Sequence, residues 1–250
     1  MEPDEALARV FKGRRYIVDE ECPGTVLDIH WDSWFGYLKD LKPVHRPTQK
    51  RMRQQVNRGR RSEIVIEELE DPAPVEQELY RILAEHHYRK NHEAFIMSPD
   101  FTTVLKKNLG RRAVILVARK NDRIVGVTIH MRNSSAMHLK FVGIANEMVR
   151  SRDGMYFNIT FNQLIKRACT EGFRQLYLGI MTYNPKCSRG ARLVPTYSWI
   201  WEPGLLRGWI LRPLLTYHAR RQQRELQPFF DMEPLTGNAP LPCYKWPSKT

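Results

Sequence analysis

The sequence lacks several features that would decide its class at once. It has no apolar run near the roughly 20 residues that a membrane-spanning helix needs. Its first residues, MEPDEALARV, include no apolar signal-peptide core. Its four cysteines lie far apart, and no Cys/His spacing is typical of a zinc site or a disulfide framework. Internal repeats are also missing. These absences predict a soluble, cytoplasmic protein without a metal site.

The composition indicates a folded, basic protein. Of 250 residues, 42% are hydrophobic and 10% aromatic, which is enough to bury a core and excludes a disordered chain. The length suits one large domain or two small ones. Lys and Arg number 40 and Asp and Glu 27, so the formal charge is 40 − 27 = +13. An excess of this size favours an anionic partner, which is a nucleic acid, a membrane surface or a phosphorylated ligand.

One segment, residues 45–61, contains no acidic residue at all. It reads HRPTQKRMRQQVNRGRR, and its cations are Arg46, Lys50, Arg51, Arg53, Arg58, Arg60 and Arg61. Surface helices usually mix both charge signs and so gain favourable pairs four residues apart. A solvated helix face is the alternative interpretation. We interpret this basic segment as a binding surface for phosphates, with a salt dependence that grows with each contact.

The periodicity of apolar residues predicts two helices around the basic segment. Residues 31–41 carry apolar side chains on one helical face, and Pro43 is expected to stop that helix. A second helix is expected over 47–57 and should end at Gly59. A short strand is expected at 15–19.

The rest of the chain alternates between helical and strand patterns. Asn121 and Asp122 separate two apolar runs and predict a hairpin. Ser98 is expected to cap the N-terminus of a helix that ends at Gly110. Further strands are expected at 63–69, 137–144, 175–179 and 196–201, and further helices at 75–90, 156–169 and 203–224, followed by a Pro-rich tail after residue 233. This order predicts an α/β fold, with a mixed, mostly antiparallel sheet flanked by helices.

Several stretches resemble a known group of proteins. The element order is similar to the GNAT superfamily of acyltransferases. LDIHWDSWFGYLKDLKPVHRPTQKRMRQ resembles the segment of Fem-like (FemABX-type) proteins in which one helix leads into an Arg/Lys-rich helix. ARKNDRIVGVTIHM resembles their hairpin, and HLKFVGI with YFNITFNQLIKRACTEGFRQLYLGIMTYNPKCSRGA resembles their C-terminal half. The resemblance covers roughly residues 27–201.

The resemblance implies an aminoacyl-tRNA-dependent transferase that forms an amide bond. Many Fem-like enzymes carry two GNAT-like domains, whereas this chain is expected to hold one, over residues 27–202. Residues 1–26 are then a lead-in, and 203–250 a C-terminal helix and Pro-rich arm. Because a peptidoglycan-precursor pocket draws on both domains, we expect a small-molecule amine as acceptor, as in natural-product biosynthesis. The partners are therefore tRNA and this amine. The sequence does not define an oligomeric state.

A glycine-rich loop for the pyrophosphate of coenzyme A is missing from the expected place. Acetyl-CoA-using GNAT enzymes carry Arg/Gln-x-x-Gly-x-Gly/Ala there, whose backbone N–H groups meet phosphate. The corresponding stretch, 142–158, has single glycines at Gly143 and Gly154, and Glu147 and Asp153 between them would repel a pyrophosphate. Arg150 and Arg152 offer compensating charge. We expect no cofactor, with aminoacyl-tRNA as co-substrate.

Candidate catalytic and binding residues fall in two places. Thr182, Tyr183 and Lys186 follow a buried strand and are the candidate catalytic residues, with Lys186 matching the Lys of the Fem-like pattern by resemblance. Ester aminolysis needs an oriented amine and a stabilised oxyanion, which one donor in this loop would supply. The candidate substrate-binding residues are Tyr156, Asn158, Asn162 and Asn184.

Three histidines and two further functions stay open as alternatives. His86, His87 and His92 cluster near a helix end, where they are either a base near neutral pH or structural groups. An acyl-CoA or an acyl-carrier protein would also suit the basic charge as acyl donor. A non-enzymatic RNA-binding module is the third interpretation.

Overall fold

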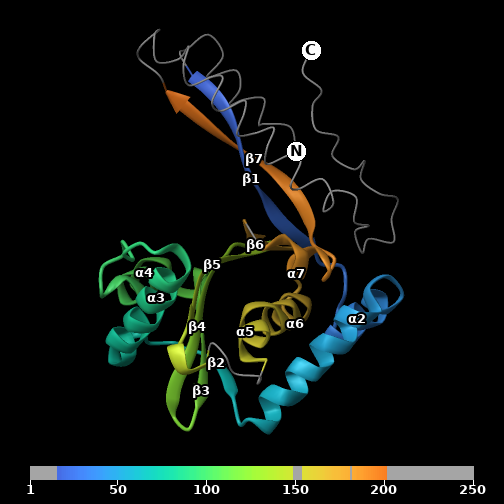
Figure 1. The fold of residues 1–250 in the computed structure, drawn as a ribbon, viewed down its shortest axis with the longest axis horizontal. Helices are drawn as coiled ribbons and strands as arrows, with labels where there is room; N and C mark the ends of the chain where they lie inside the picture. The colour runs from blue at the N-terminus through green and yellow to red at the C-terminus, as the bar shows by residue number, and fades with distance from the viewer. Residues whose placement is uncertain (1–15, 149–153, 181, 202–250) are drawn as a thin grey trace. The chain divides into compact units, whose positions relative to one another are not determined.

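The computed structural model describes residues 16–148, 154–180 and 182–201 (Figure 1). Its elements follow in the order β1 Tyr16–Asp28, α2 Trp34–Arg61, β2 Val65–Glu68, η1 Ala73–Val75, α3 Glu76–Asn91, α4 Phe101–Leu109, η2 Gly110–Arg112, β3 Ala113–Lys120, β4 Arg123–Arg132, β5 Ala136–Ile144, η3 Asn146–Met148, α5 Met155–Phe157, η4 Asn158–Asn162, α6 Gln163–Thr170, β6 Gln175–Gly179, α7 Tyr183–Cys187 and β7 Arg192–Trp201.

These elements belong to two compact units. We call Asp28–Tyr177 the central unit, and Met1–Leu27 together with Leu178–Thr250 the flanking unit. The helix expected over 203–224 and the Pro-rich tail lie outside the described residues. In the described parts of the chain, no helix combines the length and the apolar character needed to cross a membrane.

The sheet of the central unit is antiparallel except at its last strand. β2, β3, β4 and β5 pair in that order, each antiparallel to the next, and β6 joins β5 in parallel. Asn121 and Asp122 both adopt positive φ, 48° and 61°, which is the backbone of a two-residue type I′ hairpin turn. The expected hairpin and the mixed, mostly antiparallel sheet are thereby confirmed.

Helices cover both faces of this sheet (Figure 1). One face packs against α3 and α4 through a cluster that includes Leu79, Ile82, Leu83, Phe101, Ile115, Val117 and Val127. The other packs against α5 and η4 through Val114, Leu116, Ala118, Val125, Ile144, Met155 and Ile159. Because alternate residues of β3 enter opposite clusters, the strand is apolar without interruption from Ala113 to Ala118.

Two bulges interrupt the ladder beside the core. In β4, Val125 is an extra residue between Ile124 and Gly126, so Ile124 and Val127 face the same helices although they are three residues apart. In β5, the register shifts between Leu139 and Phe141. β6 pairs with β5 from Ala136 to His138, and β5 continues beyond that pairing to Ile144.

Helix α2 joins the two helices expected from the sequence. It runs from Trp34 to Arg61 and is kinked at His45, whose φ of −134° and ψ of 52° are not helical. Two prolines at 43 and 47 flank the kink, as their missing N–H groups require. Gly59 does not end the helix as expected. A Cβ at Gly59 would lie 2.7 Å from Nδ2 of Asn158, so this glycine permits close helix packing instead.

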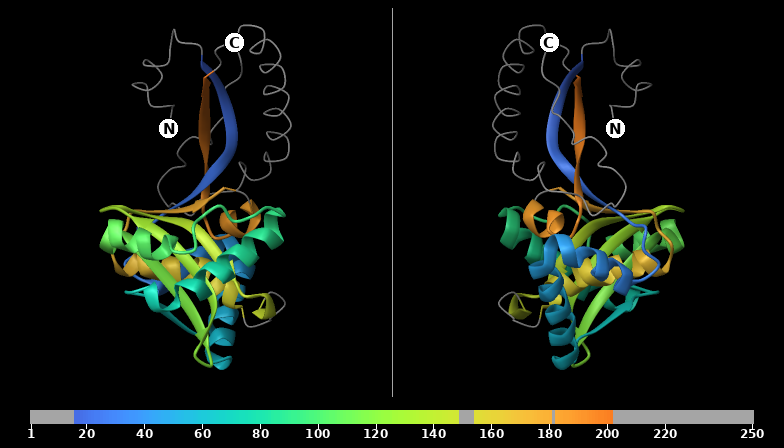
Figure 2. Two further views of the ribbon diagram at one scale, coloured as in Figure 1. Left: turned by 90° about the vertical axis from the view of Figure 1, so that its left-hand side faces the viewer. Right: turned by 90° about the vertical axis from the view of Figure 1, so that its right-hand side faces the viewer.

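The helix expected over 156–169 is present but contains an unexpected π-helical turn. Its parts are α5, the π-helix η4 and α6, in unbroken succession from Met155 to Thr170. All five residues of η4 are buried. Helix α2 packs along η4 and α6 (Figure 2). A π turn of this kind widens the helix locally and is frequent at functional sites.

The N-terminus of α4 is capped from another helix. The predicted cap, Ser98, does not serve, because α4 begins at Phe101 after Asp100, whose side chain makes no capping bond. The carboxylate of Glu76 in α3 accepts hydrogen bonds instead from the backbone N–H groups of Thr102, at 3.2 Å, and Thr103, at 2.7 Å. Both threonine hydroxyls donate to it as well.

The flanking unit contains a long antiparallel pair. β1 pairs with β7 from Tyr16–Trp201 to Val26–Arg192, with an irregularity between Glu21 and Gly24. The strand expected at 15–19 is therefore longer than predicted, because it continues past this irregularity to Asp28. Helix α7 lies in the loop after β6.

Candidate functional site

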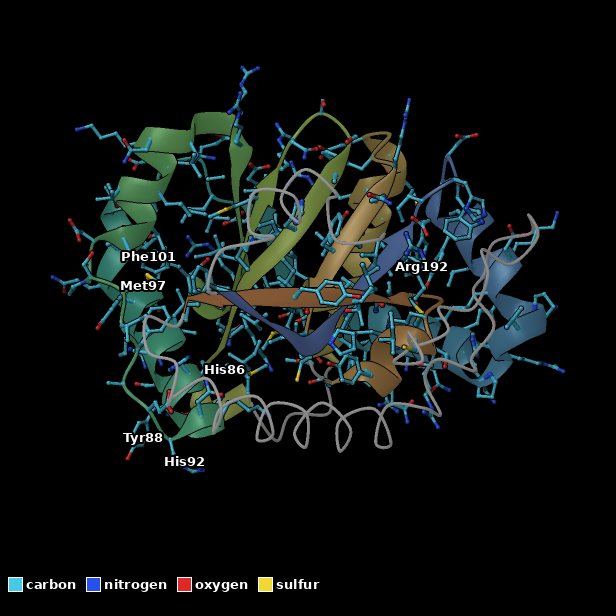
Figure 3. All side chains as sticks on the ribbon, turned by 90° about the horizontal axis from the view of Figure 1, so that it is seen from above. His86, Tyr88, His92, Met97, Phe101 and Arg192 are labelled. Atoms are coloured by element: carbon cyan, nitrogen blue, oxygen red, sulfur yellow. The ribbon has the colours of Figure 1, made fainter. Side chains whose placement is uncertain are left out.

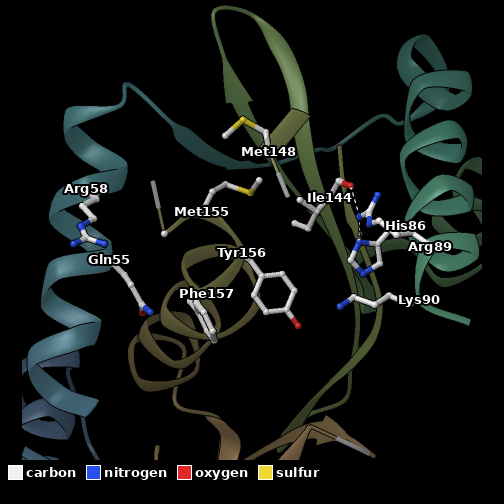
Figure 4. A pocket seen from close by; sticks show the side chains of 11 residues that line it. Gln55, Arg58, His86, Arg89, Lys90, Ile144, Met148, Met155, Tyr156 and Phe157 are labelled. Atoms are coloured by element: carbon white, nitrogen blue, oxygen red, sulfur yellow. Dashed lines mark hydrogen bonds between the residues drawn. The ribbon is translucent and has the colours of Figure 1, made fainter. Parts of the chain in front are cut away.

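A cavity of about 390 Å³ lies in the central unit (Figure 4). Its walls come from three parts of the chain that are distant in sequence: α2, the end of α3, and the segment from the end of β5 to α5. The lining residues are Gln55, Arg58, His86, Arg89, Lys90, Ile144, Met148, Gly154, Met155, Tyr156 and Phe157. Gly154, with φ of +72°, lets the start of α5 approach the backbone of Gln55 to where a Cβ would be 3.0 Å from its Cα.

The charge of this cavity is of one sign. Arg58 enters from α2, and Arg89 and Lys90 enter from α3. None of the described residues that line it is a carboxylate. Cations that face one concave surface raise the local concentration of anions. The cavity is therefore suited to a ligand that carries phosphate.

Arg89 is fixed in place by contacts to the turn after β5. Its Nη2 donates to the carbonyl oxygen of Ile144 at 3.1 Å, and its Nη1 donates to the side-chain oxygen of Asn146. Asn146 in turn donates to Glu85 at 2.9 Å. Arg89 thus links the end of α3 to the end of β5, and the guanidinium is held at the cavity wall.

His86 is the histidine that faces this cavity. Its Nδ1 lies 2.8 Å from Nη2 of Arg89. Burial, together with the neighbouring charges of Arg89 and Lys90, lowers the pKa of His86 to about 4. The other two histidines of the cluster differ, since His87 contacts Asn91 and His92 ends α3 with a φ of 59° (Figure 3).

Aromatic and thioether side chains form the apolar part of the lining. Tyr156 and Phe157 come from α5, and their rings meet edge to face at a centroid distance of 5.2 Å. Figure 4 shows the Tyr156 hydroxyl on the side of the cavity where His86 and Lys90 lie. Aromatic rings beside cations are the combination on which single-stranded nucleic acids stack.

The seven predicted tRNA-binding residues all lie on α2 and are exposed: Arg46, Lys50, Arg51, Arg53, Arg58, Arg60 and Arg61. Arg58 is the one that also lines the cavity. The basic segment and the cavity therefore meet at Arg58, within the central unit.

Asn158 and Asn162 hold α2 against η4. The side-chain amide of Asn158 donates to the backbone oxygen of Gln55 at 2.8 Å, and Asn162 donates to Oδ1 of Asn158 at 2.7 Å. Both side chains are buried, and neither lines the cavity. Of the four predicted substrate-binding residues, Tyr156 is the one that does.

The remaining predicted residues belong to the flanking unit. Lys186 is 5% exposed, and its Nζ donates to the carbonyl oxygens of Gly179, at 3.0 Å, and Ile180, at 2.9 Å. Burial lowers its pKa to about 8. The Tyr183 hydroxyl donates to the carbonyl oxygen of Pro23 at 3.1 Å. Thr182 and Asn184 are exposed, and Thr182 has a positive φ of 52°.

Sequence reasoning missed two of the three cations of the cavity, Arg89 and Lys90. Cations in the last turn of a helix are common because they offset the helix dipole, so these residues carried no functional signal. The signal that the sequence offered was their position, since both follow the apolar stripe of α3 and lie close to the histidine pair. The stretch 149–153, which includes Arg150 and Arg152, lies outside the described residues.

Comparison with known proteins identifies the family. Residues 46–186 match the family described as an acetyltransferase (GNAT) domain, and this is more than half of the chain. The chain belongs to the GNAT family. The match covers α2 from Arg46 onward, with all seven cations of the basic segment, every described lining residue of the cavity, and α7 up to Lys186. It confirms the GNAT-type fold that the sequence predicted.

Solved structures share the fold of this GNAT chain at low sequence identity. L-PGS from Bacillus licheniformis has a TM-score of 0.58 at 14% identity, over 88% of this chain and 70% of that chain. The C-terminal domain of a protein from Agrobacterium fabrum, assigned as a lysylphosphatidylglycerol synthetase, has 0.55 at 15%, over 84% and 68%. FemX has 0.53 at 10%, over 78% and 66%. No curated protein matches the chain in sequence.

The donor atoms of the described site suit anions rather than metal ions. Among the described residues, no three His, Cys, Asp or Glu side chains gather where they would hold a metal. The guanidinium groups of Arg58 and Arg89 and the ammonium of Lys90 are hydrogen-bond donors only. The site can therefore bind and orient phosphate groups and supply hydrogen bonds to oxygen.

Proposed function

We propose that this GNAT protein is an aminoacyl-tRNA-dependent transferase that joins the aminoacyl group to an amine of a small molecule. One observation carries the proposal: Arg58 belongs to the acid-free basic segment and also lines a cavity with Arg89, Lys90 and the rings of Tyr156 and Phe157. An RNA bound along α2 would therefore reach the cavity with one end. The likeness to FemX agrees with the Fem-like resemblance of the sequence, which implies this donor.

The reaction requires little from the protein. The acceptor amine attacks the ester carbonyl of the aminoacyl-tRNA, the new C–N bond forms, and the ester C–O bond breaks. The terminal ribose of the tRNA leaves as a free hydroxyl, which takes up the proton that the amine loses. Because the ester is already activated, the protein contributes by holding the reactants together and stabilising the oxyanion.

The proposal gives each group of residues a part. The seven cations of the basic segment bind tRNA phosphates, and Tyr156 contacts the donor end in the cavity. Lys186, Tyr183 and Thr182, in the flanking unit, stay the candidate catalytic residues, and Asn184 a candidate for substrate binding. For Asn158 and Asn162, the contacts to Gln55 support a positioning role, since they hold α2 beside the cavity. A natural-product acceptor is part of the proposal.

Binding of charged and uncharged tRNA tests this function. We expect a mixed aminoacyl-tRNA pool to bind more tightly than the same pool after deacylation, and both to weaken as salt rises. Reversing three charges, in R51E/R53E/R58E, should abolish binding and transfer. The matched control K107E/R111E/R112E changes the net charge equally on exposed residues outside the basic segment. Full transfer by the first variant at moderate salt would contradict the proposal.

An acyl-CoA is the second candidate donor, and the same cations favour it. Arg58, Arg89 and Lys90 fit the phosphates of coenzyme A, which would supply the acyl group as an activated thioester. Titration calorimetry with coenzyme A separates the two functions. Tight, stoichiometric binding of coenzyme A would favour this second donor, if the protein also binds charged and uncharged tRNA equally.

A further inference from the structure

The bond between His86 and Arg89 fixes where the imidazole proton lies. A guanidinium nitrogen can only donate, so Nδ1 of His86, 2.8 Å from Nη2 of Arg89, must be the acceptor. A neutral imidazole that accepts at Nδ1 carries its single proton on Nε2. His86 is thus an Nε2–H donor.

The orientation of the ring is fixed from outside its own helix. The guanidinium that holds Nδ1 is itself held by the carbonyl oxygen of Ile144, the last residue of β5, and by the side chain of Asn146 in η3. Rotation of the imidazole would break its hydrogen bond to Arg89, because the guanidinium is held in place and cannot move with the ring. Arg89 is therefore placed as a positioning residue for His86.

The Nε2 side of the ring is turned to the cavity, on the side where the Lys90 ammonium and the Tyr156 hydroxyl lie (Figure 4). The charged groups at this cavity, Arg58, Arg89 and Lys90, are donors and cannot accept a proton from His86. An acceptor for Nε2–H in this cavity is therefore an oxygen, and the surrounding cations favour one that carries negative charge.

We propose that His86 binds a phosphoryl oxygen of the acyl donor as an uncharged hydrogen-bond donor through Nε2–H, with Arg89 as its positioning residue. This inference rests on the proposed function for the identity of the donor, a tRNA 3′ end. It excludes the general-base role that the sequence left open for His86, because the one lone pair of the neutral ring is already directed at Arg89.

The electrostatic surroundings keep the ring neutral over the physiological range. The groups that face or neighbour His86 are Arg89, Lys90 and His87 from α3, Arg58 from α2, and Tyr156 from α5. A phosphate in the cavity would favour a charged imidazolium. The second proton would have to sit on Nδ1, against the guanidinium, so the Arg89 contact opposes it. The Nε2–H donor of His86 is therefore present throughout the physiological pH range.

Nuclear magnetic resonance of the free protein tests the tautomer without any assay of function. Long-range ¹H–¹⁵N correlations of the imidazole rings distinguish Nε2–H from Nδ1–H. We expect His86 to give the Nε2–H pattern and to stay unchanged between about pH 5 and 8. His87 on the same helix is the internal comparison. An Nδ1–H pattern, or an imidazolium that forms in this range, would overturn the proposal.

Two substitutions separate the donor role from a structural one. The amide nitrogen of H86Q reaches the position of Nε2 and keeps the donor, whereas H86N keeps only an acceptor for Arg89 near the position of Nδ1. The probes are the trinucleotide CCA, as a mimic of the tRNA 3′ end, and coenzyme A. We expect H86N to bind the preferred probe about tenfold or more weaker, as for a lost bond to a charged group, and H86Q to bind nearly as wild type.

The outcomes distinguish this inference from the proposed function. Binding by H86N equal to wild type, with both variants folded, overturns the donor role even if tRNA is the substrate. If the wild type prefers coenzyme A to CCA and H86N loses that binding, the donor role holds and the tRNA function fails. H87Q is the matched control and should bind either probe as the wild type does.

Discussion

Lys186 shows how one buried side chain links stability to pH. Burial lowers the pKa of its ammonium from 10.5 to about 8, so between these values the unfolded chain binds more protons than the folded one. The free energy of unfolding therefore rises with pH across this window, and the burial cost is fully present below about pH 8.

Comparison of wild type with K186M measures this effect. From about pH 7.5 to about pH 9, the wild type should gain about 1 kcal/mol more in free energy of unfolding than K186M does. Burial raises the pKa of the neighbouring Cys187 thiol to about 11, although the charge of Lys186 acts to lower it. Up to about pH 9 the folded thiol is therefore protonated with or without Lys186, so Cys187 contributes nearly equally in the two proteins. Urea unfolding at several pH values is the measurement. Parallel pH profiles would show that Lys186 is not the group that titrates.

At the same scale, Gly59 and Asn158 show why single residues mislead a reader of sequence. A glycine after a helical stretch predicts a helix end, yet here the side-chain amide of Asn158 occupies the space that a Cβ would need. Two asparagines four residues apart predict a polar face, and they do share one. That face meets Gln55 of α2 rather than solvent, which no local pattern reveals.

Among the elements, α4 depends on a carboxylate from α3 for its first turn. Glu76 accepts four hydrogen bonds from the backbone and hydroxyl groups of Thr102 and Thr103. The negative charge of Glu76 also interacts favourably with the positive end of the α4 helix dipole. E76Q removes the charge and replaces one acceptor oxygen by an NH2 group. The two N–H donors of this group then face the N–H and O–H donors of a threonine. We expect it to lower the free energy of unfolding by about 2 kcal/mol.

Thermal or urea unfolding measures this loss, and E78Q is its control. Glu78 lies in the same first turn of α3, so its substitution changes the same net charge and the same helix terminus. The expected change for E78Q is within about 0.5 kcal/mol. Equal losses in the two variants would mean that the charge, not the cap on α4, stabilises the protein.

Elements that depend on local chemistry were predictable, and those that depend on partners were not. The hairpin of β3 and β4 follows from Asn121 and Asp122, whose side chains tolerate positive φ. The π turn of η4 packs against α2, and its residues carry no distinctive pattern. The same holds for the cap on α4, since Glu76 and Thr102 are distant in sequence.

For the whole molecule, the order of elements was enough to predict the fold class, whereas the sequence predicted only part of the site. Arg58 was expected to bind tRNA and Tyr156 a substrate, and both line the cavity. Arg89 and Lys90 were not expected. The cavity is formed where α2, the end of α3, the end of β5 and α5 meet, and each contributes side chains. Such a meeting is a property of the three-dimensional fold and cannot be read from any one segment.

A net charge of +13 raises the question of whether RNA binding comes from the whole surface or from one segment. The slope of log affinity against log salt concentration decides this, because its magnitude decreases by about 0.7–0.9 for each phosphate contact removed. R51Q/R53Q/R58Q and K107Q/R111Q/R112Q each lower the net charge by three and alter exposed residues. If the basic segment makes the contacts, the first variant should lose about two units of slope and the second nearly none. Equal losses would assign binding to the general field, and the basic segment would then be a solvated helix face.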